Sequence, residues 1–292
     1  MKFTEKVLEV FAKSLSDTEK AECKHAIDMV KDALEANGYT LTKSLSTYND
    51  EMSMYYVLRD STFGTLTLLL QGSYANNTNI RRVSDVDISV LYNPILPISF
   101  EIYKQNIFEA LKNKFGTKSV ERKNKSIRVE GNAYRKSIDV VPAFLINQTP
   151  QNGIYIITDK EKERINNYPL QHIENGYEKN KATAYRYKKY VRIIKYLKFW
   201  MEESKIASAS QLGSFNVESL IWNVPDEVFR KYSSLGVGVQ EVINYLKIHE
   251  IDIYSYKEAN GIKELCPTYE EYKKYKTFVA DLQKFYQYDY MG

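Results

Sequence analysis

Cysteine, long apolar runs and strong net charge are all scarce in this sequence, and each absence narrows what the protein can be. Only Cys23 and Cys266 are present, far apart and without the spacing of metal ligands, which favours a reduced chain in the cytoplasm. No apolar run approaches the length of a membrane span, and the N-terminal stretch MKFTEKVLEV lacks the pattern of a signal peptide. We therefore expect a cytoplasmic protein that has no membrane partner.

Several common catalytic motifs are absent as well. The chain contains no Walker-A sequence, no His-Glu-x-x-His and no Gly-x-Ser-x-Gly. The histidines, His25, His172 and His249, are scattered without ligand spacing, so we interpret them as structural or surface residues. The 41 Lys and Arg against 37 Asp and Glu give a net charge of only +4. This charge suits local phosphate binding but predicts no long nucleic-acid track.

The order of apolar patterns predicts an α+β fold. Helical spacing dominates the start of the chain and stops at Asn37-Gly38. Alternating or β-rich apolar segments follow, interrupted by one amphipathic helix that ends at Gly116; the predicted strands are 65–70, 85–92, 125–131, 136–146 and 153–159. Nearly all of the later chain has helical spacing, with the main helices predicted at 183–201, 215–222, 237–247 and 269–286. We predict a mixed-sheet core with an N-terminal helix (1–160) and a helical lobe (161–292).

Two acids one residue apart mark the candidate site. In a strand, residues i and i+2 point to the same face, so Asp85 and Asp87 present both carboxylates to one side while Val86 and Ile88 face the core. Such a pair repels itself unless a hard cation with oxygen ligands lies between, above all Mg²⁺. Asp139 stands in an otherwise apolar strand, where a bare carboxylate needs a partner. Three converging carboxylates would hold two metal ions.

A Gly-Ser pair supplies the second half of the pattern. Gly72 directly follows an apolar strand, where the absence of a side chain lets the backbone approach a phosphate, and the Ser73 hydroxyl and nearby N–H groups are suitable phosphate donors. The loop that follows carries further polar residues suited to phosphate or sugar: Asn76, Asn77, Asn79, Arg81 and Arg82. A Gly-Ser turn or an Asp-x-Asp alone has a structural interpretation, namely a plain turn and a solvent-facing strand. Their conjunction with Asp139 favours function.

With these residues in view, the sequence resembles a known family. GSYANNTNIRRVSDVDISV is similar to the active-site signature of polymerase-β-like nucleotidyltransferases, and the fuller form, with QGSY, TNIR and SDVD, resembles the cGAS/DncV-like nucleotidyltransferases of bacterial anti-phage (CBASS) signalling. The resemblance implies that Asp85, Asp87 and Asp139 bind two Mg²⁺ ions, with Mn²⁺ as an alternative, and that Gly72 and Ser73 form the phosphate turn. It also implies a polymerase-β-like core whose nucleotide cleft is closed by the helical lobe.

The helical half carries the resemblance further. KKYVRIIKYLKFW and QLGSFNVESLIWNVP resemble family segments that contact the nucleotide. Matched residue by residue, Lys195 corresponds to the family lysine that reaches the donor triphosphate. Ser214 corresponds to the hydroxyl that touches phosphate, and Phe215 to the ring that stacks on the base. Arg192 lies one helical turn before Lys195 and is a further candidate for phosphate. The structural alternatives are a solvated face for Arg192 and Lys195, an N-cap for Ser214 and plain core for Phe215.

The tyrosines near the C-terminus have two interpretations. Tyr269, Tyr272 and Tyr275 recur near helix spacing, which predicts that they pack one face of a final helix against the bundle. A surface that stacks on bases or binds RNA is the alternative. Acidic residues interleave with the lysines of this segment, and this mixture argues against an RNA groove.

The resemblance implies a reaction and its partners. A ribose hydroxyl attacks the α-phosphate of an NTP and releases pyrophosphate, and repetition with ring closure gives a cyclic di- or oligonucleotide second messenger that a downstream effector protein binds. Asp139 is the candidate to assist deprotonation. Three alternatives remain open at this point: a template-independent transferase acting on RNA ends, an enzyme that transfers AMP to a protein or small molecule, and a catalytically silent nucleotide-binding scaffold.

Overall fold

A computed structural model describes residues 2–47, 53–60, 64–94, 97–148 and 152–289. The chain forms two compact units, which we describe separately. The sheet unit consists of Leu15–Asn77 and Arg81–Leu170, and the helical unit consists of Met1–Ser14, Thr78–Ile80 and Gln171–Gly292. These ranges differ from the predicted 1–160 and 161–292 in two respects: the first residues and a short loop segment belong with the helical unit, and the later division falls at residue 170.

The sheet unit is built on one mixed β-sheet. Its strands are β2 (Thr40–Thr47), β3 (Ser53–Asp60), β4 (Gly64–Gln71), β5 (Val86–Pro94), β6 (Val120–Arg122), β7 (Ile127–Val129), β8 (Ile138–Leu145), β9 (Ile154–Ile157) and β10 (Arg164–Asn167). The order along the main path is β10-β9-β8-β5-β4-β3-β2, and β7 pairs with both β6 and β8. The β5–β8 pair is parallel, whereas the other pairs are antiparallel. The predicted α+β fold with a mixed sheet is confirmed.

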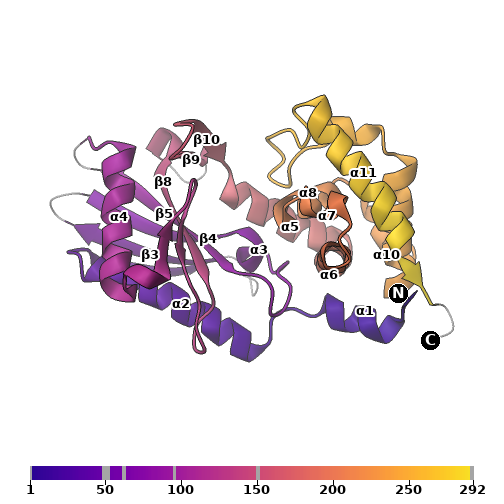
Figure 1. Cartoon of the computed structure of the whole chain (residues 1–292), viewed down its shortest axis with the longest axis horizontal. Helices are drawn as coiled ribbons and strands as arrows, with labels where there is room; N and C mark the ends of the chain where they lie inside the picture. The colour runs from indigo at the N-terminus through magenta and orange to yellow at the C-terminus, as the bar shows by residue number, and fades with distance from the viewer. Residues whose placement is uncertain (1, 48–52, 61–63, 95–96, 149–151, 290–292) are drawn as a thin grey trace. The chain divides into compact units, whose positions relative to one another are not determined.

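Alternation in the central strands fixes which side chains face the core. Val86, Ile88 and Val90 of β5 are buried, whereas Asp87 between them is half-buried. Two helices of this unit, α2 (Asp17–Glu35) and α4 (Phe100–Phe115), pack against each other (Figure 1). The helix α4 also contacts β6, β7 and β8. The Tyr103 hydroxyl of α4 donates to the Val90 carbonyl at 2.5 Å, which ties this helix to the strand that carries the acid.

The N-terminal helical segment is interrupted between Ala12 and Asp17. The N-terminal helical pattern is confirmed but divides into α1 (Glu5–Ala12) and α2, and Ser16 caps α2 in a reciprocal pair with Glu19. This Ser-x-x-Glu arrangement satisfies two backbone donors at the start of a helix. The predicted stop is confirmed as well, because α2 ends at Glu35 and Gly38 has a φ of 98°. The strands β2 and β3 that follow were not predicted.

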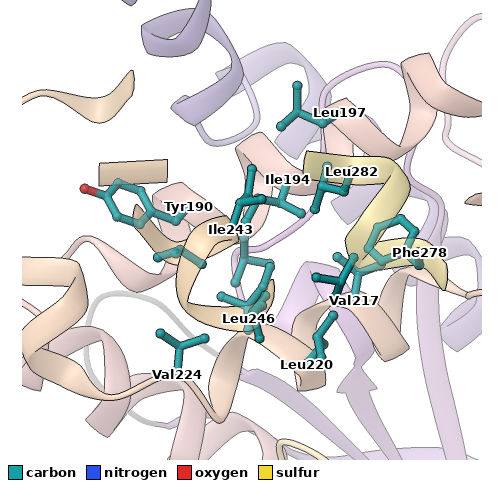
Figure 2. Close-up of a cluster of buried hydrophobic side chains, with 14 of the residues drawn as sticks. Tyr190, Ile194, Leu197, Val217, Leu220, Val224, Ile243, Leu246, Phe278 and Leu282 are labelled. Atoms are coloured by element: carbon teal, nitrogen blue, oxygen red, sulfur yellow. The ribbon is translucent and has the colours of Figure 1, made fainter. Parts of the chain in front are cut away.

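The helical unit has its own hydrophobic core. Its elements are β1 (Lys2–Phe3), α1, α5 (Pro169–Ala182, whose first residues belong to the sheet unit), α6 (Tyr187–Glu203), α7 (Ala207–Ser210), α8 (Ser214–Trp222), α9 (Asp226–Arg230), α10 (Leu235–Ile248), α11 (Tyr269–Phe285) and β11 (Gln287–Tyr288). Apolar side chains of α6, α8, α10 and α11 meet in one cluster, and Figure 2 shows Ile194, Leu246 and Phe278 among them. The predicted C-terminal helical lobe is confirmed. Within the described residues, no helix has the length and apolar character needed to cross a membrane.

Two predictions for the later chain need correction. β10 shows that residues just beyond 160 are not helical; they pair with β9 and extend the sheet. The three tyrosines do not share one buried face, because Tyr272 and Tyr275 are buried in the core whereas Tyr269 is 59% exposed. Tyr269 is the first residue of α11, where the helix has not yet reached the bundle's apolar cluster.

Candidate active site

Two neighbouring strands bring the predicted acids together in the sheet unit. Asp85 immediately precedes β5, Asp87 lies within it, and Asp139 is the second residue of β8. Asp87 and Asp139 are partners in the parallel β5–β8 register, so their side chains leave the same face of adjacent strands, about 4.8 Å apart along the sheet. The side chains of Asp85 and Asp139 are 42% and 24% exposed. The register therefore sets Asp87 beside Asp139, and the convergence of all three acids stays a prediction.

The Gly-Ser turn lies directly beside Asp87. Gln71, the last residue of β4, pairs with Asp87 across the sheet, and the next residue, Gly72, begins the short helix α3 (Gly72–Ala75). Gly72 has a φ of 66°, and a Cβ built on it would lie 2.4 Å from Asp87 Oδ2. Only glycine tolerates both the left-handed backbone and this close approach. Ser73 follows at once and is half-buried.

The loop after this turn is more buried than its polar sequence indicates. Asn76 and Asn79 are buried, and Asn76 Nδ2 donates to the Gly72 carbonyl at 3.2 Å. Asn76 therefore supports the start of the loop, and neither side chain lies at the surface. On the other side of the loop, Glu19 Oε1 accepts the Arg82 N–H at 2.7 Å. This contact fixes the turn shortly before Asp85.

A positive charge that sequence reasoning missed lies among the acids. Arg128 Nη1 of β7 donates to Asp85 Oδ2 at 2.7 Å and to Asp139 Oδ2 at 3.0 Å. Burial opposes the charge of Arg128, but the hydrogen bond and charge of Asp85, together with the charges of Asp139 and Glu130, raise the pKa of the guanidinium overall. The signal was available in principle, because Arg128 alternates with Ile127 and Val129 and pairs with Asp139 across β7 and β8.

The acids are chemically suited to a divalent metal ion, although the structure does not assemble a complete site. In the described part of the chain, no three His, Cys, Asp or Glu side chains are grouped closely enough to hold an ion. The donors themselves fit: Asp85 and Asp139 direct carboxylate oxygens at one cationic nitrogen, and carboxylate oxygens are the ligands that Mg²⁺ prefers. A cation already occupies the point where these two oxygens meet, and it is Arg128.

The helical unit places Lys195 in a buried charge network. Its Nζ donates to Glu218 Oε2 at 2.6 Å, to the Thr78 hydroxyl at 3.1 Å and to the Thr78 carbonyl at 3.2 Å. A lysine has three N–H donors, so these acceptors use all of them. The side chain is only 2% exposed, and the solvated-face alternative for Lys195 is therefore wrong.

Glu218 is the centre of that network. Besides Lys195, its carboxylate accepts from the Thr78 hydroxyl at 2.5 Å and lies 2.9 Å from His172 Nε2. Burial alone would raise the pKa of Glu218, but the charges and hydrogen bonds of Lys195 and His172 outweigh burial and hold the pKa far below 4.5. The structural interpretation of His172 agrees with these contacts. Sequence reasoning missed Glu218, whose partners are remote in the chain.

The other basic residues of α6 also have local partners. Arg192 is buried and its Nε donates to the Ala12 carbonyl at 2.7 Å, so it holds the end of α1. Lys198 forms a 2.6 Å ion pair with Glu202 one turn later. The solvated-face alternative for Arg192 is wrong because the residue is buried. Arg192 and Lys198 therefore each bind a partner of their own.

Ser214 and Phe215 are both available at the surface of the helical unit. Ser214 is the first residue of α8 and is exposed; the N-cap is Gly213, so the N-cap alternative for Ser214 is wrong. Phe215 is 37% exposed, which also contradicts the plain-core alternative. Its ring meets His172 edge to face, with centroids 5.1 Å apart. The predicted site residues thus form two sets, one in each unit: Gly72, Ser73, Asp85, Asp87 and Asp139, and Arg192, Lys195, Ser214 and Phe215.

Comparison with protein families matches both halves of the chain. Residues 44–180 match the Second Messenger Oligonucleotide or Dinucleotide Synthetase domain. Residues 174–287 match the cGAS/DncV-like nucleotidyltransferase C-terminal helical domain. The two matches together contain all of the predicted site residues.

Individual relatives align over nearly the whole chain. The cyclic GMP-AMP synthase CdnE03 of Staphylococcus schleiferi is 37% identical, over 99% of this chain and 98% of its own. The cyclic dipyrimidine nucleotide synthase CdnE of Cecembia lonarensis is 32% identical over 90% of each chain. The structure of Elizabethkingia meningoseptica CdnE cyclic dinucleotide synthase with GTP and Apcpp is similar, with a TM-score of 0.78, 30% identity, and coverage of 97% of this chain and 99% of that one. With an acid set and a Gly-Ser turn that match the resemblance seen in its sequence, the chain belongs to the cGAS/DncV-like nucleotidyltransferases.

Proposed function

We propose that this protein joins NTPs into a cyclic di- or oligonucleotide and releases pyrophosphate at each bond formed. The observation that carries the proposal is the position of Gly72 against the Asp87 carboxylate, with Asp139 in register on the neighbouring strand. This arrangement supports the assignment of a phosphate turn beside metal-binding acids. The relatives support the cyclic product, since they are cyclic nucleotide synthases.

The residues of the sheet unit have distinct tasks in this reaction. The Gly72–Ser73 turn binds the triphosphate of the donor through backbone N–H groups and the serine hydroxyl. Asp85, Asp87 and Asp139 would hold two divalent ions, Mg²⁺ or Mn²⁺, which would supply Lewis-acid stabilisation of charge on the phosphate oxygens. Asp139 assists removal of the proton from the attacking ribose hydroxyl, at a carboxylate oxygen. Its Oδ1 is held by the Ser126 hydroxyl at 3.2 Å, which orients the group.

The helical unit contributes to binding of the nucleotide. The Phe215 ring is exposed enough to stack on a base, and the neighbouring Ser214 hydroxyl is available to phosphate. Lys195 fixes Thr78, six residues along the chain from Gly72, through all three of its donors. We assign Lys195 first to positioning this loop, since direct contact with triphosphate requires one of those bonds to break. Arg192 supports α1 in the same indirect way.

The product serves as a second messenger for an effector protein in defence against phage, by analogy with the family resemblance. The rival with the same chemistry is a transferase that extends RNA ends. To separate them, the protein is incubated with Mg²⁺ and labelled NTPs, singly and in pairs, with and without single-stranded RNA, and the products are treated with phosphatase. We expect a phosphatase-resistant product from NTPs alone and no extended RNA. Label at the 3′ end of RNA, weakening steeply with salt, would favour the rival instead.

A further inference from the structure

The position of Arg128 raises a question about how the acids bind a metal ion at all. Its Nη1 is within 3.0 Å of an oxygen of Asp85 and of Asp139, and its Nε is 3.5 Å from Glu130 Oε1. The side chain is 13% exposed. An arginine cannot give up its charge in a protein. This single guanidinium therefore offsets part of the negative charge of Asp85 and Asp139 and weakens the repulsion between them.

A metal ion and Arg128 compete for the same oxygens. Mg²⁺ binds carboxylate oxygens at about 2.0–2.1 Å, so an ion shared by Asp85 and Asp139 occupies the space in which Nη1 meets both. Asp139 meets Arg128 through Oδ2, while its Oδ1 accepts from the Ser126 hydroxyl at 3.2 Å. An ion between the two acids must therefore break at least one of the Arg128 hydrogen bonds.

On this basis, and resting on the proposed function, we propose that Arg128 is a built-in competitor of the metal ion: it occupies the site in the metal-free protein and must swing away for the ion to bind. The displaced guanidinium needs a new anionic partner, and a triphosphate offers one, since its oxygens suit the planar fork of donors. Metal alone therefore binds weakly, and metal with an NTP binds cooperatively. Arg128 is a positioning residue in this scheme, not a catalytic one.

Direct binding of Mn²⁺ without nucleotide, followed by calorimetry or electron paramagnetic resonance, tests the competition. Arg128→Gln removes the competing charge while keeping a polar side chain. Hydrogen bonds to charged groups are worth ~1.5–3 kcal/mol, so Mn²⁺ affinity should rise by about 10-fold or more. A non-hydrolysable NTP analogue should tighten Mn²⁺ binding strongly in the wild type and much less in Arg128→Gln.

Arg122→Gln is the matched control. Arg122 also lies in the sheet unit, on β6, with an 18% exposed side chain that bonds Asp159 at 2.8 Å and Glu101 at 2.6 Å, away from the predicted acids. Its loss should lower stability but leave Mn²⁺ affinity unchanged. If Arg128→Gln unfolds without metal, Arg128→Lys serves in its place. This variant keeps the positive charge but loses the planar fork of donors, and it should bind Mn²⁺ more tightly than the wild type does.

The outcomes separate this inference from the proposed function. Equal Mn²⁺ affinity in the wild type and both Arg128 variants overturns the competition, even if the enzyme is active. Binding that strengthens in Arg128→Gln and disappears in Asp139→Asn supports it. Failure of the proposed function gives a different result. Substitution of Asp85, Asp87 or Asp139 by Asn would then leave Mn²⁺ binding unchanged, with or without the NTP analogue.

Discussion

Gly72→Ala tests whether the Asp87 carboxylate must lie where the structure puts it. A Cβ at residue 72 would lie 2.4 Å from Asp87 Oδ2, whereas ordinary contacts of a Cβ begin at 3.4 Å. The carboxylate must therefore move by about 1 Å, and a displacement of ~1 Å in an active site lowers the rate by on the order of 100-fold. The φ of 66° adds backbone strain of ~1–3 kcal/mol to the alanine variant.

Gly116→Ala separates the strain from the clash. Gly116 follows α4 in the same unit with a φ of 83°, and a Cβ built there meets nothing within 4 Å. Initial rates of pyrophosphate release at saturating NTP and Mg²⁺ are compared with urea unfolding of both variants. We expect both to lose stability and only Gly72→Ala to lose about 100-fold in rate. Full activity in a folded Gly72→Ala variant would refute the reasoning, because Asp87 would then work from a displaced position.

Three further predictions concern the helical unit. Lys195→Met should lower the free energy of unfolding by ~3–5 kcal/mol in urea titrations, because it leaves the buried Glu218 carboxylate without its lysine. The control Lys198→Met loses only the ion pair with Glu202 and should lower it by at most ~0.5 kcal/mol. Equal losses in the two variants would contradict the buried network. Because the pKa of Glu218 is lowered, the unfolded chain takes up a proton below about pH 4.5 that the folded chain does not. The free energy of unfolding should therefore decrease as the pH is lowered through that range, and it should decrease less steeply in Glu218→Gln. Equal pH slopes in the wild type and Glu218→Gln would argue against the pKa shift. Phe215→Ala should raise KM for NTP by about 5- to 150-fold if the ring stacks on a base, a contact worth ~1–3 kcal/mol, and an unchanged KM would remove that role.

Local pattern was enough to predict the central strands and the acids they carry. Alternation of apolar residues indicated β5 and β8, and the period of two placed Val86 and Ile88 inside, as observed. The shared face of Asp85 and Asp87 stays a prediction. These are properties of neighbouring residues along one strand. The Gly-Ser turn was predictable for the same reason, since it follows directly from the end of β4.

What the sequence could not provide was the partner of each charged residue. Glu218 lies 23 residues from Lys195 and 140 from Thr78, and the register that sets Arg128 beside Asp139 depends on how β7 and β8 pair. Spacing on a helix placed Arg192, Lys195 and Lys198 near one another. Tertiary packing instead gives Arg192 and Lys195 separate, remote partners, which no local pattern encodes. Lys198 pairs with Glu202 one turn along its own helix.

The ratio of pyrophosphate released to nucleotide incorporated tests the central claim most directly. In a ring every nucleotide has lost its pyrophosphate, whereas a linear product keeps one triphosphate at its 5′ end. The purified protein is therefore incubated with Mg²⁺ and NTPs until substrate is consumed, and pyrophosphate is quantified beside the product mass. The account predicts one pyrophosphate per incorporated nucleotide and a product mass equal to a whole number of nucleoside monophosphates less one water for each bond. A ratio below one, with a product from which phosphatase removes terminal phosphates, would contradict the cyclic product.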